Sequence, residues 1–348
     1  MARPRPARIL RDADPAHLTG ARVGVFGFGN QGRAQAECLR DSGVAVRVLP
    51  RAGGPSEAAV TEAGFPVLRA TDLGECDILA VLVPDEVQAE LLNGPIRSHA
   101  APGTLLLFAH GFTLREHPRL LREDLDAALV CPLGPGSLLR ERFLEGGGLA
   151  GLFAVVQDFT GTAEARALAY AAAIGLTRAG LIETTLEEEV VSDLFAEQAV
   201  LVGGAVELMR AAWETLVEAG VSGEVAYYSC VEELRQILEL VSRDGPAGMR
   251  SAISTTARYG GLTRGPRIVG EDARAEMRAA LEEIRTGSFA AEWKQEQEFG
   301  GGRLEDLTRR EREHPMEAAG RRVRAELGPA GDADRDDPAE VDTGHPEI

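Results

Sequence analysis

The chain has 348 residues, 55 acidic and 37 basic side chains, a formal net charge of −18 and a pI near 4.9. So acidic a chain is a poor partner for nucleic acid or for an anionic membrane surface, and its length is enough for two domains with cores of their own. Its four cysteines (Cys38, Cys76, Cys131 and Cys230) are widely spaced without a CxxC pair, which favours reduced, buried thiols over disulfides or a thiolate metal site.

No apolar run reaches the length needed to span a membrane, and Met1–Asp14 lacks the apolar centre of a signal peptide. We therefore expect a cytoplasmic protein with neither a membrane nor a nucleic acid as partner. The chain shows no internal repeat, so we do not expect its two domains to be copies of one another.

Strand and helix patterns alternate from Ala21 to about Glu183, which is typical of an α/β, doubly wound parallel sheet of the Rossmann type. The expected strands are short apolar runs bounded by turn residues. They lie at Val23–Phe26, Val44–Leu49, Asp77–Val83, Thr104–Ala109, Ala127–Val130 and Leu152–Gln157.

A glycine-rich turn separates the first strand from the helix expected at Arg33–Ser42. The turn reads Gly27-Phe28-Gly29-Asn30-Gln31-Gly32. Gly27 permits the tight turn, Gly29 lets the backbone approach a pyrophosphate, and Gly32 lets the helix pack closely on the strand. The helix would then face the phosphates with unpaired N–H groups. A purely structural glycine turn is the alternative, but the flanking strands and helix favour an N-terminal dinucleotide-binding domain, which we place at residues 1–183.

The residues after the second strand bear on which dinucleotide binds. Leu49-Pro50-Arg51 carries no acid that could accept a hydrogen bond from a ribose 2′-hydroxyl. Arg51 at that place suits the 2′-phosphate of NADP, and Ser56 could assist. The pattern favours NADP over NAD, with an exposed loop cation at Arg51 as the alternative.

After Glu183 the pattern becomes helical, which predicts an all-α C-terminal domain at residues 184–327. Residues 328–348 are rich in Pro, Gly and Asp with almost nothing apolar, and we expect a disordered acidic tail there. The expected helices lie at Leu186–Ala219, Gly223–Ser242, Asp272–Arg285, Phe289–Gly300 and Arg309–Leu327.

Two acids in the first of these helices, Asp193 and Glu197, are candidate metal ligands. They lie four residues apart in a run of helical periodicity, so both side chains are expected on one face. Carboxylate oxygens are the ligands that Mg²⁺ prefers. A solvated acidic face is the alternative, which the dinucleotide signature in the same chain makes less favoured.

Several motifs in the same order as the elements resemble the ketol-acid reductoisomerase family in its short bacterial form. They are GFGNQGRAQAECLRDSGV (27–44), PDEVQ (84–88), FAHGF (108–112), GPG (134–136), IETT (182–185), DLFAEQAVLVGGAVEL (193–208) and ETLVEAG (214–220). The resemblance implies an NADPH- and Mg²⁺-dependent alkyl shift and reduction of a 2-acetohydroxy acid in branched-chain amino-acid synthesis. It also implies a knotted helical domain that dimerises.

Carried over residue by residue, the resemblance assigns the metal to Asp193, Glu197 and Glu233. Ser254 would hold the substrate carboxylate, and His110 would lie near nicotinamide and substrate. Pro84, together with the glycine turn, Arg51 and Ser56, completes the cofactor contacts that the resemblance implies.

The chain departs from the family pattern at two positions in this site. Ser229 stands where the family has a glutamate four residues before Glu233, and Leu133 stands where it has a lysine beside the bridging oxygen between two metals. Glu232 could replace the lost ligand, but it lies about 100° around the helix from Glu233. Ala52 and Gly54 also replace cofactor-loop hydroxyls.

These departures leave three hypotheses for the function. The first is a diverged oxidoreductase on a 2-hydroxy or 2-oxo acid, with a nicotinamide cofactor and one Mg²⁺, in a specialised natural-product pathway; closure of an enolate to a cyclopropanol is its sharpest form. The second is the ordinary reductoisomerase, impaired but functional. The third is a cofactor-binding paralogue without activity. The retained ligands argue against the third, because a degenerate paralogue would lose them at random.

Overall fold

The computed structural model describes residues 6–50 and 55–328. These residues form two compact units, Met1–Ser192 and Asp193–Ile348, which divide within one helix, α9 (Leu186–Ala196). The expected cofactor-loop residues Arg51, Ala52 and Gly54 and the expected tail at 329–348 lie outside the described part of the chain.

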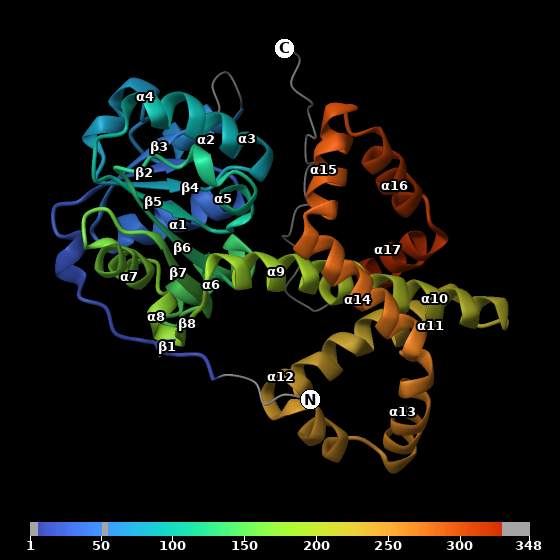
Figure 1. Ribbon diagram of the computed structural model, residues 1–348. Helices are drawn as coiled ribbons and strands as arrows, with labels where there is room; N and C mark the ends of the chain where they lie inside the picture. Colours follow the sequence, from blue (N-terminus) through green and yellow to red (C-terminus); the bar gives the residue numbers. More distant parts are fainter. Residues whose placement is uncertain (1–5, 51–54, 329–348) are drawn as a thin grey trace. The chain divides into compact units, whose positions relative to one another are not determined.

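The first unit is built on an eight-stranded sheet with the strand order β1-β8-β7-β6-β5-β4-β2-β3 (Figure 1). Strands β3, β2, β4, β5 and β6 are parallel neighbours, which confirms the Rossmann-type fold. The strands are β1 (Ile9–Leu10), β2 (Arg22–Phe26), β3 (Ala45–Leu49), β4 (Ile78–Val81), β5 (Leu105–Phe108), β6 (Asp126–Pro132), β7 (Gly151–Gln157) and β8 (Leu181–Glu183).

The expected all-parallel sheet is wrong at one edge, because β7 runs antiparallel to β6 and β8 antiparallel to β1. The helix between β6 and β7, α6 (Gly136–Leu144), does not cross the sheet: the chain returns to the edge that it left, and Pro132 pairs with Gly151. Hydrophobic periodicity reports which residues are buried but not the direction of a strand, so the sequence pattern could not distinguish the two.

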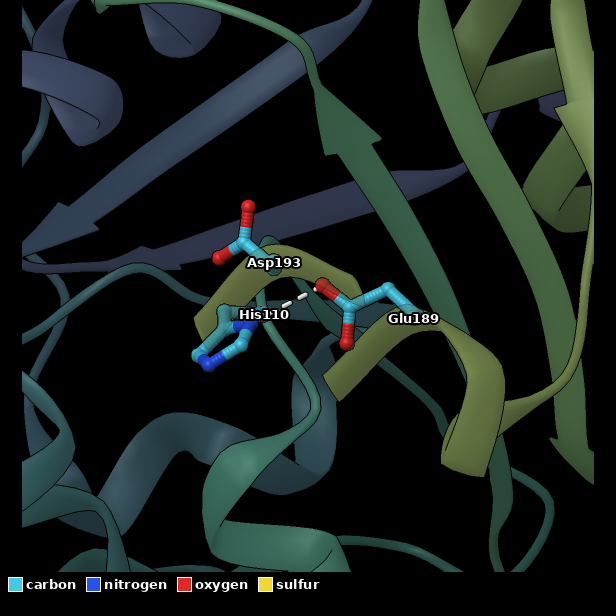
Figure 2. A group of neighbouring side chains, drawn as sticks. All are labelled: His110, Glu189 and Asp193. Atoms are coloured by element: carbon cyan, nitrogen blue, oxygen red, sulfur yellow. Dashed lines mark hydrogen bonds and ion pairs between the residues drawn. The ribbon is translucent and has the colours of Figure 1, made fainter. Parts of the chain in front are cut away.

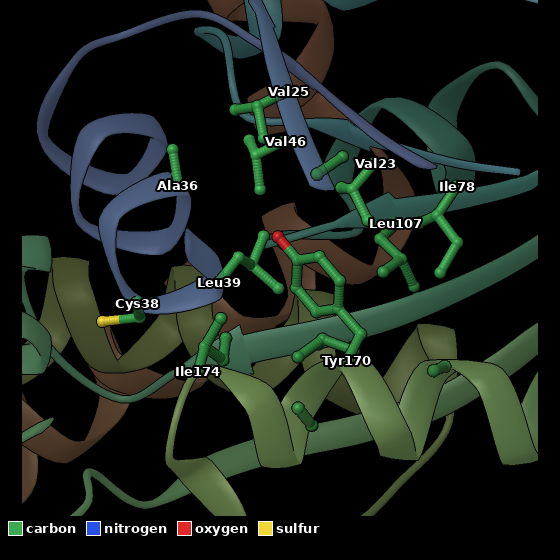
Figure 3. Packing of buried hydrophobic residues seen from close by; sticks show 14 of the residues in the cluster. Val23, Val25, Ala36, Cys38, Leu39, Val46, Ile78, Leu107, Tyr170 and Ile174 are labelled. Atoms are coloured by element: carbon green, nitrogen blue, oxygen red, sulfur yellow. The ribbon is translucent and has the colours of Figure 1, made fainter. Parts of the chain in front are cut away.

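Helices cover both faces of this sheet, since alternate strand residues enter two separate cores. On one face Val25 and Leu107 pack with Leu39 of α1 and Tyr170 of α7 (Figure 3). On the other face Phe26 and Phe108 pack with Ile96 and Leu114. The helices of this unit include α1 (Asn30–Asp41), α2 (Pro55–Glu62), α3 (Asp85–Leu91), α4 (Arg97–His99), α5 (Phe112–Glu116), α6, α7 (Ala163–Ala173) and α8 (Leu176–Ala179).

The second unit is helical, as expected, but its core is small. One buried cluster holds Trp213, Ala226, Tyr227, Met316, Ala319 and Val323. The helices are α10 (Gly204–Glu218), α11 (Gly223–Tyr227), α12 (Glu233–Ala252), α13 (Thr255–Ile268), α14 (Glu271–Thr286), α15 (Ser288–Glu298), α16 (Gly302–Arg312) and α17 (Pro315–Leu327). The knotted path of this domain stays a prediction.

The prediction of a single helix at Leu186–Ala219 is wrong. Helix α9 ends at Ala196, a π-helical turn follows at Glu197–Leu201, and α10 starts at Gly204. Gly203 and Gly204 permit this break, because a Cβ on either would lie 2.1 Å from a carbonyl oxygen of the preceding turn. A second π-helical turn, Tyr228–Glu232, interrupts the helix expected at Gly223–Ser242.

Two further differences lie near the C-terminus. The helix expected at Arg309–Leu327 is divided into α16 and α17, because Pro315 starts a new helix that the His314 side chain caps. Helix α13 was not expected, because Gly260, Gly261 and Pro266 weaken its helical pattern. None of its described residues is buried, so no apolar face marks it either.

Candidate active site

Four predicted site residues or turns follow parallel strands directly, and so they gather at one edge of the sheet. The glycine turn follows β2, Pro84 follows β4, His110 follows β5 and Leu133 follows β6. The carboxyl ends of parallel strands are where doubly wound folds bind their ligands. These residues therefore mark the candidate ligand-binding edge of the first unit.

The glycine turn has the geometry that a pyrophosphate needs. Gly27 has a φ of +87°, and a Cβ on Gly32 would lie 2.3 Å from the carbonyl oxygen of Gly27. A Cβ on Gly29 would meet nothing within 4 Å, and Gly29 starts α1 without a side-chain cap. The open space and the uncapped helix N-terminus fit a dinucleotide phosphate.

Phe28 and Ser56 are two other predicted cofactor contacts, and the structure gives each a buried or partly buried position. The Phe28 ring is buried and meets Phe65 edge-on, with 5.7 Å between the ring centroids, so its backbone rather than its ring can face a cofactor. Ser56 lies in the first turn of α2, partly buried.

His110 is held by an acid that the sequence reasoning missed, Glu189. The two oxygens of this carboxylate lie 2.9 Å from His110 Nδ1 and 2.9 Å from the backbone nitrogen of Gly111. Glu189 is only 1% exposed. Since a carboxylate can only accept, Nδ1 carries the proton, and the ring presents its Nε2 on the other side.

A second ion pair fixes the same helix. Arg115 of α5 donates to both oxygens of Glu187, at 2.7 and 3.0 Å, which holds the first turn of α9 against α5.

The sequence contained a signal for Glu189 that the prediction did not use. It lies four residues before Asp193, on the same helical face, in a run of three acids of which the other two are exposed.

Asp193 joins this pair one helical turn later (Figure 2). Ligand atoms of His110, Glu189 and Asp193 all lie within 4.8 Å of one another, close enough to surround a metal ion. Both oxygens of Glu189 already accept hydrogen bonds. We therefore regard Glu189 as the residue that orients His110, and Asp193 as the carboxylate of this group that could hold a metal.

The other predicted ligands lie at the π-helical turns. Glu197 starts one of them, and Glu233 directly follows the other. Such turns are rare and frequently occur at functional sites. Across residues 6–50 and 55–328, however, no cluster of three ligating side chains contains Glu197 or Glu233. One chain therefore does not bring the predicted set Asp193, Glu197 and Glu233 together.

Ser229 and Glu233 lie along one groove of the second unit, about 310 Å³ in volume, with Cys230 between them and Leu208 and Met209 opposite. Burial raises the pKa of the Cys230 thiol, and the nearby Glu233 carboxylate raises it further. Ser254 caps the N-terminus of α13, where its hydroxyl accepts from the backbone nitrogen of Ala257 at 3.2 Å.

The chain matches known protein families and solved structures over most of its length. Residues 17–180 match the acetohydroxy acid isomeroreductase, NADPH-binding domain, and residues 186–328 match the ketol-acid reductoisomerase, C-terminal domain. The chain is also 39% identical to an NADH-preferring ketol-acid reductoisomerase from an uncultured archean, over 91% of this chain and 98% of that one, with a TM-score of 0.88. The chain belongs to the ketol-acid reductoisomerase family.

Membership of the ketol-acid reductoisomerase family makes the chain an NAD(P)-dependent oxidoreductase and isomerase by class, so the hypothesis of a paralogue without activity is not retained. A putative oxidoreductase from Jannaschia sp. CCS1 is 16% identical over 76% of this chain and 97% of that one, with a TM-score of 0.56. A semialdehyde dehydrogenase NAD-binding protein from Cupriavidus necator is 19% identical over 76% and 99%, with a TM-score of 0.57. These two share only the fold.

As a reductoisomerase relative, the chain has a nicotinamide-binding domain at the position that the glycine turn predicted. Among the described residues, no helix is both long and apolar enough to cross a membrane.

Proposed function

We propose that this reductoisomerase relative oxidises or reduces a small 2-hydroxy or 2-oxo acid, with the family's alkyl shift slowed or replaced by another step. The observation that carries the proposal is Leu133. This residue follows β6 at the ligand-binding edge, and 45% of it is exposed there. An alkyl shift develops negative charge on oxygen, and an apolar side chain cannot stabilise that charge as an ammonium would.

The first unit has no lysine that could replace the ammonium missing at Leu133, because Lys294 is the only lysine in the sequence. Lys294 lies on α15 of the second unit, where it is exposed and 3.8 Å from Glu298. The remaining cations are arginines, whose planar guanidinium groups bind oxygen differently from an ammonium.

We propose that Asp193, Glu197 and Glu233 hold one Mg²⁺ ion. Their carboxylates are the right donors for it, and the hydroxyl of Ser229 carries no charge for a second ion. When bound, Mg²⁺ polarises the oxygens of a 2-oxo or 2-hydroxy acid, and the nicotinamide exchanges a hydride with the substrate. In this proposal His110, oriented by Glu189, holds or moves a proton at its Nε2, and Ser254 binds the substrate carboxylate.

The second unit supports a homodimer or larger homo-oligomer. Large apolar side chains stay exposed on several of its helices, including Leu201 (62%), Leu238 (55%), Tyr259 (66%) and Ile268 (64%), which is costly for an isolated chain. We propose that a second copy covers them and supplies Glu233 to the metal site. Leu238→Asp should then convert the oligomer to a monomer in light scattering, whereas an unchanged mass would contradict this assembly.

We propose NADP as the preferred cofactor, from Arg51 at the end of the second predicted strand, with NAD as the alternative. The archaeal relative is NADH-preferring by its own description, so the preference within the family varies.

The ordinary reductoisomerase reaction is the second candidate. The 39% identity to a ketol-acid reductoisomerase over nearly the whole of both chains favours it. Leu133 favours the diverged reading instead, and within that reading a specialised substrate with a cationic sulfonium leaving group, which an ammonium at this place would repel. If a base removes the C2 proton of such a 2-hydroxy acid, the enolate carbon C2 can displace a sulfonium on C4 as a neutral thioether, and the three-membered ring keeps the hydroxyl group as a cyclopropanol.

Turnover assays separate these candidates. Purified protein with Mg²⁺ and NADPH is given acetolactate in one reaction, and in others a panel of 2-oxo acids that need no alkyl shift. We expect NADPH oxidation with a 2-oxo acid, and acetolactate turnover at least about two orders of magnitude slower than in typical relatives. Rapid acetolactate turnover would refute the diverged function, and a sulfonium-bearing 2-hydroxy acid tests the cyclopropanol step by product mass.

A further inference from the structure

Three side chains form a hydrogen-bonded relay from the core of the first unit to the ligand-binding edge. The Tyr170 hydroxyl donates to Gln35 Oε1 at 2.9 Å, and Gln35 Nε2 donates to Gln31 Oε1 at 3.1 Å. Gln31 Nε2 then donates to the carbonyl oxygen of Gly134 at 2.9 Å. Tyr170 and Gln35 are each 1% exposed.

The relay has one direction only. Burial raises the pKa of Tyr170, so the phenol keeps its proton and donates it. The carbonyl oxygen of Gly134 can only accept, so Gln31 must turn its Nε2 toward Gly134 and its Oε1 toward Gln35. Gln35 must then turn its Nε2 toward Gln31 and its Oε1 toward Tyr170, because a flipped amide would place two oxygens against each other.

Tyr170 is therefore more than a space-filling core residue. Its ring lies in the apolar cluster with Leu39, Leu107 and Ile174 (Figure 3), and its hydroxyl holds the Oε1 of Gln35 at the buried end of the relay. A buried phenol without a partner would be destabilising, so the packing of the core and the orientation of Gln35 depend on each other.

The end of the relay lies where two functional loops meet. Gln31 belongs to the first turn of α1, two residues after Gly29, and Gly134 follows Leu133. The backbone nitrogen of Gly136 also donates to the side chain of Asn30, and a Cβ on Gly136 would lie 2.1 Å from the carbonyl oxygen of Asn30. The cofactor turn and the loop Leu133–Gly136 are thus in direct contact, and the relay connects that contact to the core.

We propose that Gln31 is a positioning residue whose carboxamide, anchored in the core through Gln35 and Tyr170, fixes the loop Leu133–Gly136 against the cofactor turn. The inference deepens the proposed function and rests on it, because it gives Leu133 a defined place beside the bound dinucleotide. Ordering this loop before the cofactor arrives raises affinity, because less conformational freedom is lost on binding.

The central test is Tyr170→Phe, which removes one hydroxyl and keeps the ring. In the protein without cofactor, we expect hydrogen exchange of the peptide spanning Leu133–Gly136 to become about 5–10-fold faster. The Kd for NADPH should rise about 3–10-fold in the same variant, measured by fluorescence titration in the absence of substrate.

Thr104→Val is the matched control. It also removes a buried hydroxyl, which donates to the carbonyl oxygen of Cys76 at 3.3 Å, but at the opposite end of β5 from the cofactor turn. Its melting temperature should fall to a similar extent while exchange at Leu133–Gly136 and the Kd stay unchanged. Equal effects of the two variants would show a merely structural role and overturn the proposal.

Gln31→Met supplies the second variant, because its partly exposed position removes the relay without disturbing the buried core. It should accelerate the same exchange whether or not Tyr170→Phe folds. In the double variant, Tyr170→Phe should add nothing further, since both substitutions break one relay; additive effects would refute it. If the unaltered protein binds neither NADPH nor NADH, the proposed function fails, while the exchange measurements still decide whether the relay fixes the loop.

Discussion

Glu189 and His110 are joined by a 2.9 Å hydrogen bond in which the buried carboxylate also accepts from the backbone of Gly111. This contact sets the tautomer of the imidazole that follows β5. It also connects the loop after β5 to α9, the helix that carries Asp193.

Replacing Glu189 by glutamine should therefore impair catalysis more than folding. A glutamine offers one oxygen and one NH₂, so it cannot accept from both His110 and Gly111, and the ring must change its tautomer or its orientation. We expect kcat to fall about 10–100-fold, with little change in the Kd for NADPH. Glu188→Gln is the control, because the neighbouring acid is exposed and its side chain accepts a hydrogen bond from the Thr184 hydroxyl at 3.1 Å. Similar rates for both variants would contradict an orienting role.

Substitutions in the glycine turn should separate binding from stability. Gly29→Val adds a side chain to open space that a pyrophosphate would occupy, so cofactor binding should be lost while the melting temperature is kept. Gly32→Ala places a methyl group 2.3 Å from the carbonyl oxygen of Gly27. That variant should lose about 1–3 kcal/mol of unfolding free energy in urea titrations. If Gly29→Val binds NADPH as well as the unaltered protein, the dinucleotide site lies elsewhere.

Each site should bind one Mg²⁺ ion tightly, because Ser229 offers no charge to a second. Isothermal titration with Mg²⁺, or electron paramagnetic resonance with Mn²⁺, measures the stoichiometry directly. Asp193→Asn should abolish this binding, and Ser229→Glu should raise the number of ions toward two. Two fully occupied ions in the unaltered protein would refute the proposal.

Restoring the family's residues should restore part of the family's reaction. Leu133→Lys with Ser229→Glu supplies the missing cation and carboxylate, each of which stabilises developing charge. We expect acetolactate isomeroreduction to rise about 10²–10³-fold over the unaltered protein. Leu133→Met with Ser229→Gln keeps similar volumes without the charges, and an equal gain in that variant would show that charge is not the cause.

Arg51 should discriminate between the two nicotinamide dinucleotides. Arg51→Ala removes the proposed partner of the 2′-phosphate, so the Kd for NADPH should rise about 10–100-fold, consistent with the loss of a charged hydrogen bond. The Kd for NADH should change little, because NADH lacks that phosphate. Equal affinities of the unaltered protein for both cofactors would overturn the NADP preference while leaving the dinucleotide site intact.

The sequence predicted the first unit well because its strands are apolar runs between turn residues. The strands expected at Val44–Leu49 and Thr104–Ala109 coincide with β3 and β5 to within a residue at each end. It missed β1 and β8, which have two and three residues and carry too little pattern. It could not give the direction of β7, because direction depends on where the connecting helix returns.

The helical unit was harder to predict because its stability comes from tertiary packing. The break after Ala196 depends on close backbone approaches at Gly203 and Gly204, which no periodicity encodes. Helix α13 has no buried face to detect. Glu189 was missed because one-dimensional spacing showed three acids in a row, and only the structure shows which of them points toward His110.

Helix α9 also limits how the length of this segment can change. Glu189 and Asp193 lie four residues apart on it, so their side chains share one face. Inserting or deleting a single residue between them would rotate one acid by about 100° relative to the other and shift it by about 1.5 Å along the axis. The imidazole contact and the metal ligand could then no longer face the same space. This stretch of chain should therefore tolerate neither insertion nor deletion.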